Sequence, residues 1–130
     1  MLLVVQRCKS AEVYVSKKII SKINRGLVLL LGFEKKDSLK DVIFLANKVT
    51  SLRVFNDDHD KTNLSINDVK GSILVVSQFT LCADTTKGRR PSFINSAKPA
   101  KAEKLYDNFI LELKKRGIKC KSGTFGAYME

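Results

Sequence analysis

The chain has 130 residues with a formal net charge of +11, and 44% of its residues are hydrophobic, which is typical of a globular domain that buries a core without disulfides. The longest apolar run, residues 27–31, is too short to cross a bilayer, and residues 1–5 lack the basic flank and the length of a signal peptide. We therefore expect a soluble, cytoplasmic protein that folds as one domain over residues 1–130.

The residues that usually form metal sites are sparse. The three cysteines are odd in number, widely spaced and without a CxxC pair, so neither a disulfide framework nor a zinc site is indicated. The only histidine, His59, lies among aspartates in a segment typical of a loop. We expect no metal and no cofactor.

The positive charge is spread along the chain, with 24 Lys and Arg against 13 Asp and Glu. Such an excess favours a polyanionic partner, because basic side chains neutralise phosphates and release counterions. A lysine-rich proteome would produce the same balance without any such partner. Charge alone therefore leaves both interpretations open.

The first half of the chain predicts strands followed by a helix. Antiparallel strands are expected at residues 2–7, 11–15 and 19–23, and a buried strand at 28–31. From Ser38 the apolar residues recur at helical spacing, which predicts an amphipathic helix of about four turns. A strand at 53–55 and a polar loop over 56–67 should follow.

The second half contains the most apolar strand and the clearest helix. Residues 73–76 are four consecutive aliphatics, which indicates a strand buried on both faces. A second amphipathic helix begins near Pro99 and ends at Gly117, before a last strand from Ile118. The pattern predicts a mixed α/β fold, with largely antiparallel sheets and two amphipathic helices packed on one side.

The buried strand ends in a polar segment, Ser77, Gln78, Phe79 and Thr80. A rigid strand that ends in hydroxyl and amide groups can hold donors and backbone N–H groups as acyl-transfer chemistry requires. On composition alone a polar turn that simply ends the strand is favoured, because Ser and Thr often end strands for local reasons.

A long stretch without periodicity, residues 81–98, follows this segment and contains the cations Lys87, Arg89 and Arg90. A loop this long in a compact domain is often functional, and these cations are candidates to hold an RNA 3′ end against residues 77–80. A solvated basic loop explains the same residues equally well.

The segment Ser77-Gln78-Phe79-Thr80, preceded by Leu74-Val75-Val76, resembles the SQxT signature of the D-aminoacyl-tRNA deacylases. Further segments resemble that family in the same order, so the resemblance covers the whole chain: Val5-Gln6-Arg7, Leu30-Leu31-Gly32, Glu34-Lys35, Arg53-Val54-Phe55, Gly88-Arg89-Arg90-Pro91-Ser92-Phe93, Lys104-Leu105-Tyr106 and Gly123-Thr124-Phe125-Gly126-Ala127-Tyr128-Met129.

The resemblance implies hydrolysis of D-aminoacyl-tRNA, and of glycyl-tRNA mischarged on tRNA-Ala, by a homodimer. It places Ser77, Gln78, Phe79 and Thr80 at the reacting centre, with Thr80 as a hydrogen-bonding group. It also places Phe125 and Met129 beside the pocket, although as ordinary core residues they would need no such role.

No His, Cys or carboxylate constellation is evident in the sequence. A hydrolase with this inventory would rely on positioning, on backbone N–H groups near Phe79 and Thr80, and on a proton acceptor supplied by the substrate. An aminoacyl-tRNA ester has such an acceptor in the free ribose hydroxyl of its terminal adenosine.

The sequence departs from the family at its end. This sequence ends at Glu130, whereas the family continues into a strand with an Asn-x-Gly-Pro-x-Thr motif. In the family, one subunit inserts a Gly-cis-Pro pair into the other subunit's site, where its carbonyls exclude L-amino acids. We expect the full-length form to carry that strand, and the 130-residue chain to have little or no stereospecific activity.

Two other functions stay open from the sequence. One is a basic nucleic-acid-binding protein without catalysis. The other is a sibling editing deacylase that removes glycine or a misplaced L-amino acid.

Overall fold

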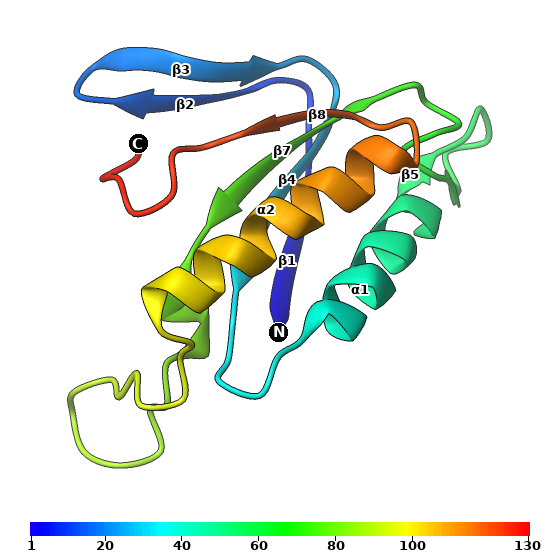
Figure 1. Ribbon diagram of the computed structural model, residues 1–130. Coiled ribbons are helices and arrows are strands. Elements are labelled where there is room, and N and C mark those ends of the chain that lie inside the picture. The colour runs from blue at the N-terminus through cyan, green and yellow to red at the C-terminus, as the bar shows by residue number, and fades with distance from the viewer.

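The computed structural model describes residues 1–130 and shows a four-stranded sheet with two helices on one face (Figure 1). The sheet order is β1-β4-β7-β8, and two further strand pairs, β2-β3 and β5-β6, lie outside it. Neither helix has the length and apolar character that crossing a membrane requires. The elements in chain order are β1 (Leu2–Cys8), β2 (Ala11–Val15), β3 (Lys18–Ile23), β4 (Gly26–Gly32), α1 (Leu39–Ser51), β5 (Phe55–Asn56), β6 (Thr62–Leu64), β7 (Ser72–Ser77), the 3-10 helix η1 (Phe79–Cys82), α2 (Pro99–Lys115) and β8 (Lys119–Ser122).

The expected mixed α/β fold with two helices on one side is confirmed, and the strand pairing adds detail. β1 is antiparallel to β4, while β4, β7 and β8 run parallel to one another. β1 does not pair with β2, as consecutive antiparallel strands would; it pairs with β4, and β2 pairs with β3. The β2-β3 hairpin therefore does not extend the four-stranded sheet but packs against it.

Two local expectations were wrong. The strand expected at 53–55 is only Phe55–Asn56, and its partner β6 lies inside the expected polar loop. Asp57 organises the connection between them, because its carboxylate accepts hydrogen bonds from the backbone N–H groups of His59 and Lys61. These bonds lower the pKa of Asp57, with the Lys61 N–H as the main cause.

Helix α1 begins and ends where the sequence predicted. Asp41 accepts hydrogen bonds from the backbone N–H of Ser38 (2.8 Å) and from its hydroxyl (2.9 Å), which fixes the first turn. These bonds lower the pKa of Asp41. Helix α2 has Pro99 in its first turn, and Gly117 follows it at φ +76°, a conformation that glycine adopts without strain.

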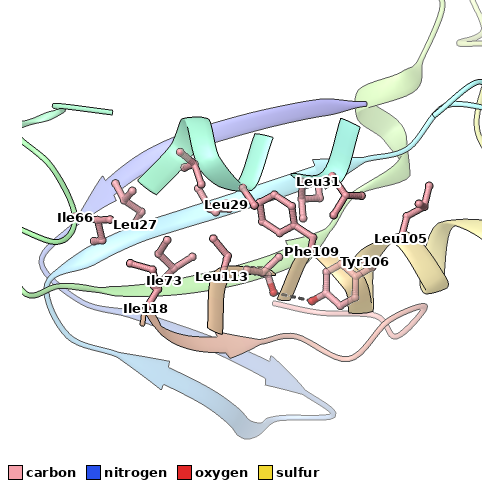
Figure 2. Packing of buried hydrophobic residues seen from close by; sticks show 14 of the residues in the cluster. Leu27, Leu29, Leu31, Ile66, Ile73, Leu105, Tyr106, Phe109, Leu113 and Ile118 are labelled. Carbon is pink, nitrogen blue, oxygen red and sulfur yellow. Dashed lines mark hydrogen bonds between the residues drawn. The ribbon is translucent and has the colours of Figure 1, made fainter. Parts of the chain in front are cut away.

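The main core lies between the sheet and the two helices (Figure 2). Alternate residues of β4 point into it, and both helices contribute side chains that are almost inaccessible to solvent. Close packing of this kind fixes the positions of the strand ends, which carry the candidate site. The fully buried members of this layer include Leu27, Leu29, Val42, Ala46, Val49, Phe109 and Leu113.

The opposite face of the sheet is only partly covered. The β2-β3 hairpin buries Leu74 of β7 under Val13 and Ile23. Beyond the hairpin, Leu2 is 39% exposed and Val4 is 43% exposed. Because Val4 stands opposite Leu30 in the register, these side chains form an apolar strip on the helix-free face.

Candidate active site

A pocket of about 670 Å³ opens where β7 ends, beside the beginning of α2. Four parts of the chain that are distant in sequence form its wall: the end of β4, the end of β7, the segment that leads into α2, and the C-terminal segment. Ten of its fifteen lining residues are hydrophobic, and few polar groups face it. The lining residues are Leu31, Phe33, Val76, Ser77, Gln78, Phe79, Ser96, Ala97, Pro99, Ala102, Phe125, Gly126, Ala127, Tyr128 and Met129.

The polar segment after β7 is held tightly against β4. The backbone N–H of Gln78 donates to the carbonyl of Leu31 at 2.7 Å, which extends the parallel pairing by one residue. Gly32 permits this approach, because a Cβ there would lie 3.0 to 3.1 Å from Leu81, Cys82 and Gln78. The chain then turns at once into η1.

Two backbone donors at this turn are unused. The N–H groups of Phe79 and Thr80 have no hydrogen-bond acceptor within the protein. The side-chain amide of Gln78 donates to the Thr80 hydroxyl. Ser77, Gln78 and Phe79 line the pocket, whereas Thr80 lies beside it and contacts it through Gln78.

Met129 reaches the pocket because the C-terminal segment folds back on the sheet. Gly123 donates its N–H to the carbonyl of Val75 at 2.9 Å, and Glu130 exchanges two backbone hydrogen bonds with Tyr14 of β2. A Cβ at Gly123 would lie 2.5 Å from the Met129 sulfur, so glycine at this position lets the Met129 side chain pack there.

Phe125 also lines the pocket, and its ring packs against Tyr106 of α2 with centroids 5.7 Å apart. The Tyr106 hydroxyl donates to the carbonyl of Val75 at 2.8 Å, a bond drawn in Figure 2. Burial raises the pKa of Tyr106 far above its usual range, so it stays a neutral donor. Phe125 and Met129 therefore combine a core contact with a place in the pocket wall.

The cations expected to bind RNA lie outside the pocket. Asp84 and Ser92 exchange two backbone hydrogen bonds (2.8 and 2.9 Å), which close a loop with Lys87, Arg89 and Arg90 at its tip. This loop extends away from the body of the protein (yellow-green in Figure 1). All three cations are exposed, and none forms an ion pair.

The pocket wall contains no carboxylate, imidazole, thiol or ammonium group. Cys82, the last residue of η1, is buried, and its thiol donates to the carbonyl of Phe33 at 3.4 Å. Burial raises the pKa of Cys82, which keeps it a neutral thiol. The pocket can therefore position a substrate and donate hydrogen bonds, but it offers no strong nucleophile or base.

Several pocket residues were not predicted from the sequence. Leu31, Phe33, Ala97 and Ala102 are apolar and give no chemical signal in a sequence. Ser96 could have been noticed as a polar residue near the start of α2. Its hydroxyl is buried, and its contact with the Cys82 thiol offsets part of the rise in that thiol's pKa.

Residues 4–130 match the family model described as D-Tyr-tRNA(Tyr) deacylase. The chain belongs to this deacylase family. It is 52% identical over 128 residues to the D-aminoacyl-tRNA deacylase of Thermosipho melanesiensis, a match that covers 98% of this chain and 85% of that protein. It is also 52% identical over 127 residues to the one from Desulfatibacillum aliphaticivorans, covering 98% of this chain and 87% of that protein.

Solved structures agree with the fold of this deacylase family member. The c-Myc DNA unwinding element binding protein has a TM-score of 0.92 and 40% identity, and the match covers 98% of this chain and 87% of that one. A probable eukaryotic D-amino acid tRNA deacylase has a TM-score of 0.84 at 18% identity, which supports the fold alone. The prediction of an enzyme of the D-aminoacyl-tRNA deacylase family is confirmed.

Proposed function

We propose that the protein hydrolyses the ester bond of D-aminoacyl-tRNA, releasing a free D-amino acid and tRNA. The observation that carries this proposal is the apolar pocket at the end of β7: its wall includes Phe79, and the N–H groups of Phe79 and the following Thr80 have no acceptor within the protein. Residues 1–130 form the deacylase domain in this proposal, and the protein acts in the cytoplasm, where charged tRNA is used.

The proposed reaction is attack of water on the ester carbonyl carbon. The carbonyl oxygen becomes an oxyanion, which the N–H groups of Phe79 and Thr80 stabilise. One proton of the attacking water passes to the neighbouring ribose hydroxyl, and that hydroxyl gives its own proton to the ribose oxygen of the ester, which leaves as the carbon–oxygen bond breaks. This assistance from the RNA supplies the base that the pocket wall lacks.

The polar residues have separate roles in this proposal. Thr80 holds the Gln78 amide, and the two together fix the turn that aims the N–H groups. Ser77 adds a hydroxyl at the strand end, while Phe125 and Met129 shape the apolar wall around the amino acid.

The tRNA contacts are assigned to the basic loop. The loop follows η1, which begins at the pocket, and its three cations are exposed and form no ion pair: Lys87, Arg89 and Arg90. They can therefore bind phosphates close to the 3′ end of the tRNA. The apolar wall has no charged group that would require a polar amino-acid side chain, which leads us to include glycyl-tRNA mischarged on tRNA-Ala among the substrates.

We infer a homodimer from the helix-free face of the sheet. Leu2 and Val4 are exposed there beside Leu30, and a second copy would remove this apolar strip from water. Sedimentation at micromolar concentration tests this assembly.

A second candidate is a nucleic-acid-binding protein without catalysis. It is favoured by the net charge of +11 and by the 40% identity to a structure named as a DNA unwinding element binding protein. Deacylation of D-tyrosyl-tRNA by the full-length protein separates the two. Release of tyrosine faster than the spontaneous rate supports the enzyme, whereas salt-dependent RNA binding without cleavage supports the binding protein.

A further inference from the structure

Two phenylalanine rings form an exposed pair at the outer rim of the pocket. Phe79 is 60% exposed and Phe93 is 37% exposed, and their rings meet edge to face with centroids 5.0 Å apart. Aromatic rings left in water forgo the stabilisation that burial would give them. A pair of this kind therefore suits a ligand that covers it.

Both rings stand on backbone that is held in place. Phe79 follows directly after the hydrogen bond between Gln78 and Leu31. Phe93 follows directly after Ser92, which exchanges two backbone hydrogen bonds with Asp84. The pair thus presents a surface that is organised before any ligand binds, which lowers the entropic cost of binding.

The pair extends the pocket outward. Phe79 lines the pocket, whereas Phe93 lies outside it on the loop that carries the cations. A pocket of about 670 Å³ has the size of a typical small-molecule site, so it can hold one aminoacylated nucleoside. If the terminal nucleoside occupies the pocket, the next base of the RNA lies outside it, where the Phe93 ring is exposed.

We propose that Phe93, supported by the edge of Phe79, stacks on the penultimate nucleobase of the bound RNA 3′ end. This inference rests on the proposed function. Stacking on an aromatic side chain tolerates any base, because every base has a π-face. The cations of the same loop would hold the flanking phosphates, so one segment binds both the base and the backbone.

A second copy of the chain is the main competing occupant of this surface. The neighbouring cations Lys87, Arg89 and Arg90 have no acidic partners. Each copy also has a net charge of +11, so bringing two such loops together would place like charges near each other. RNA is the complementary partner by charge.

The test measures binding of two fluorescently labelled RNA oligonucleotides to the full-length protein. One ends in CCA and the other has an abasic site at the penultimate position. The parent protein should bind the abasic RNA about 5- to 150-fold more weakly, which is the range expected for one base stacked on an aromatic ring. Phe93→Ala should bind both RNAs equally, and Phe93→Tyr should restore the difference.

Ile94→Ala is the matched control, because Ile94 is the neighbouring residue and is 68% exposed but not aromatic. It should behave as the parent does. The inference is overturned if Phe93→Ala still binds the CCA RNA more tightly than the abasic RNA by the same factor as the parent. It is also overturned if Phe93→Ala changes the sedimentation of the protein but not its affinity for RNA.

Deacylation of D-tyrosyl-tRNA is measured on the same parent sample. Cleavage together with equal binding of the two RNAs would reject the stacking and leave the proposed function standing. Discrimination against the abasic RNA without cleavage would support the stacking and reject the proposed function.

Discussion

The amide of Gln78 donates a hydrogen bond to the hydroxyl of Thr80, two residues further along the same turn. The Gln78 backbone is itself bound to the carbonyl of Leu31 in β4. The turn is therefore anchored to the sheet at one end and cross-linked by side chains at the other. This arrangement fixes the direction of the free N–H groups of Phe79 and Thr80.

Thr80→Ala should lower deacylation by about fivefold, because losing one hydrogen bond of about 1 kcal/mol frees the Gln78 amide and loosens the turn. Binding of uncharged tRNA should stay the same, since Thr80 does not carry phosphate contacts. Single-turnover kinetics and RNA titration measure the two effects. Thr80→Ser should retain most activity, and an equal loss of cleavage and binding in Thr80→Ala would reject this role.

Replacing Lys87, Arg89 and Arg90 together by alanine should weaken tRNA binding and flatten its salt dependence. Each lost phosphate contact should reduce the slope of log affinity against log salt by about 0.7 to 0.9. Titrations over a series of KCl concentrations give the slope. A matched control is the triple change of Lys17, Lys18 and Lys40, which are also exposed lysines. An unchanged slope in the loop variant would place the RNA elsewhere on the surface.

Val4→Asp should produce a monomer if the helix-free face of the sheet is the dimer interface. A charge buried between two copies is strongly unfavourable, whereas at 43% exposure it is tolerated in a single copy. Sedimentation velocity measures the result. Ile43→Asp is the control, because Ile43 is 42% exposed but lies on α1, on the other face of the sheet. If Val4→Asp sediments as the parent does, the helix-free face of the sheet is not the dimer interface.

The helices were predictable because their signals are local. The start of α1 is marked by Ser38 and Asp41, which are three residues apart. The start of α2 is marked by Pro99, and Gly117 follows its end. The parallel pairing of β4 with β7 was not predictable, because it joins residues more than 40 positions apart and depends on packing of the whole core. The short strand β6 was missed because its polar residues resemble those of a loop.

The candidate site was predictable only where it carries polar or charged residues. Ser77, Gln78, Phe79, Phe125 and Met129 lie together at the pocket, and Thr80 lies beside it. The basic loop was recognised by its charge, but its separation from the pocket wall needed the structure. The apolar wall gives no signal until the fold brings its parts together.

Tyr106→Phe should destabilise the protein by about 1 kcal/mol, because the hydroxyl that donates to the Val75 carbonyl is buried. The carbonyl keeps its second donor, the Gly123 N–H, so the loss should stay moderate. Urea unfolding followed by circular dichroism measures it. A loss above about 3 kcal/mol would indicate that the change also disrupts the packing of Phe125.

The free energy of unfolding should fall between about pH 9 and pH 11, because the Cys120 thiol ionises more readily in the unfolded chain than in the folded one. Burial raises the pKa of this thiol from 9.0 to about 11. Above pH 9 the unfolded chain loses this proton while the folded chain keeps it, so unfolding becomes more favourable as pH rises through this window. A shift of this size corresponds to about 2.7 kcal/mol, and because Cys120 is only partly buried we expect about 2 kcal/mol. Cys120→Ala should show a flatter decline in unfolding free energy over this range, and an identical decline would reject the assignment.

The most direct test of the proposed function compares D-tyrosyl-tRNA and L-tyrosyl-tRNA with the full-length protein. The account predicts that D-tyrosyl-tRNA is hydrolysed far faster than its spontaneous rate and that L-tyrosyl-tRNA is left intact, with cleavage diminished in Thr80→Ala. A protein that binds both tRNAs and leaves both esters intact would contradict it.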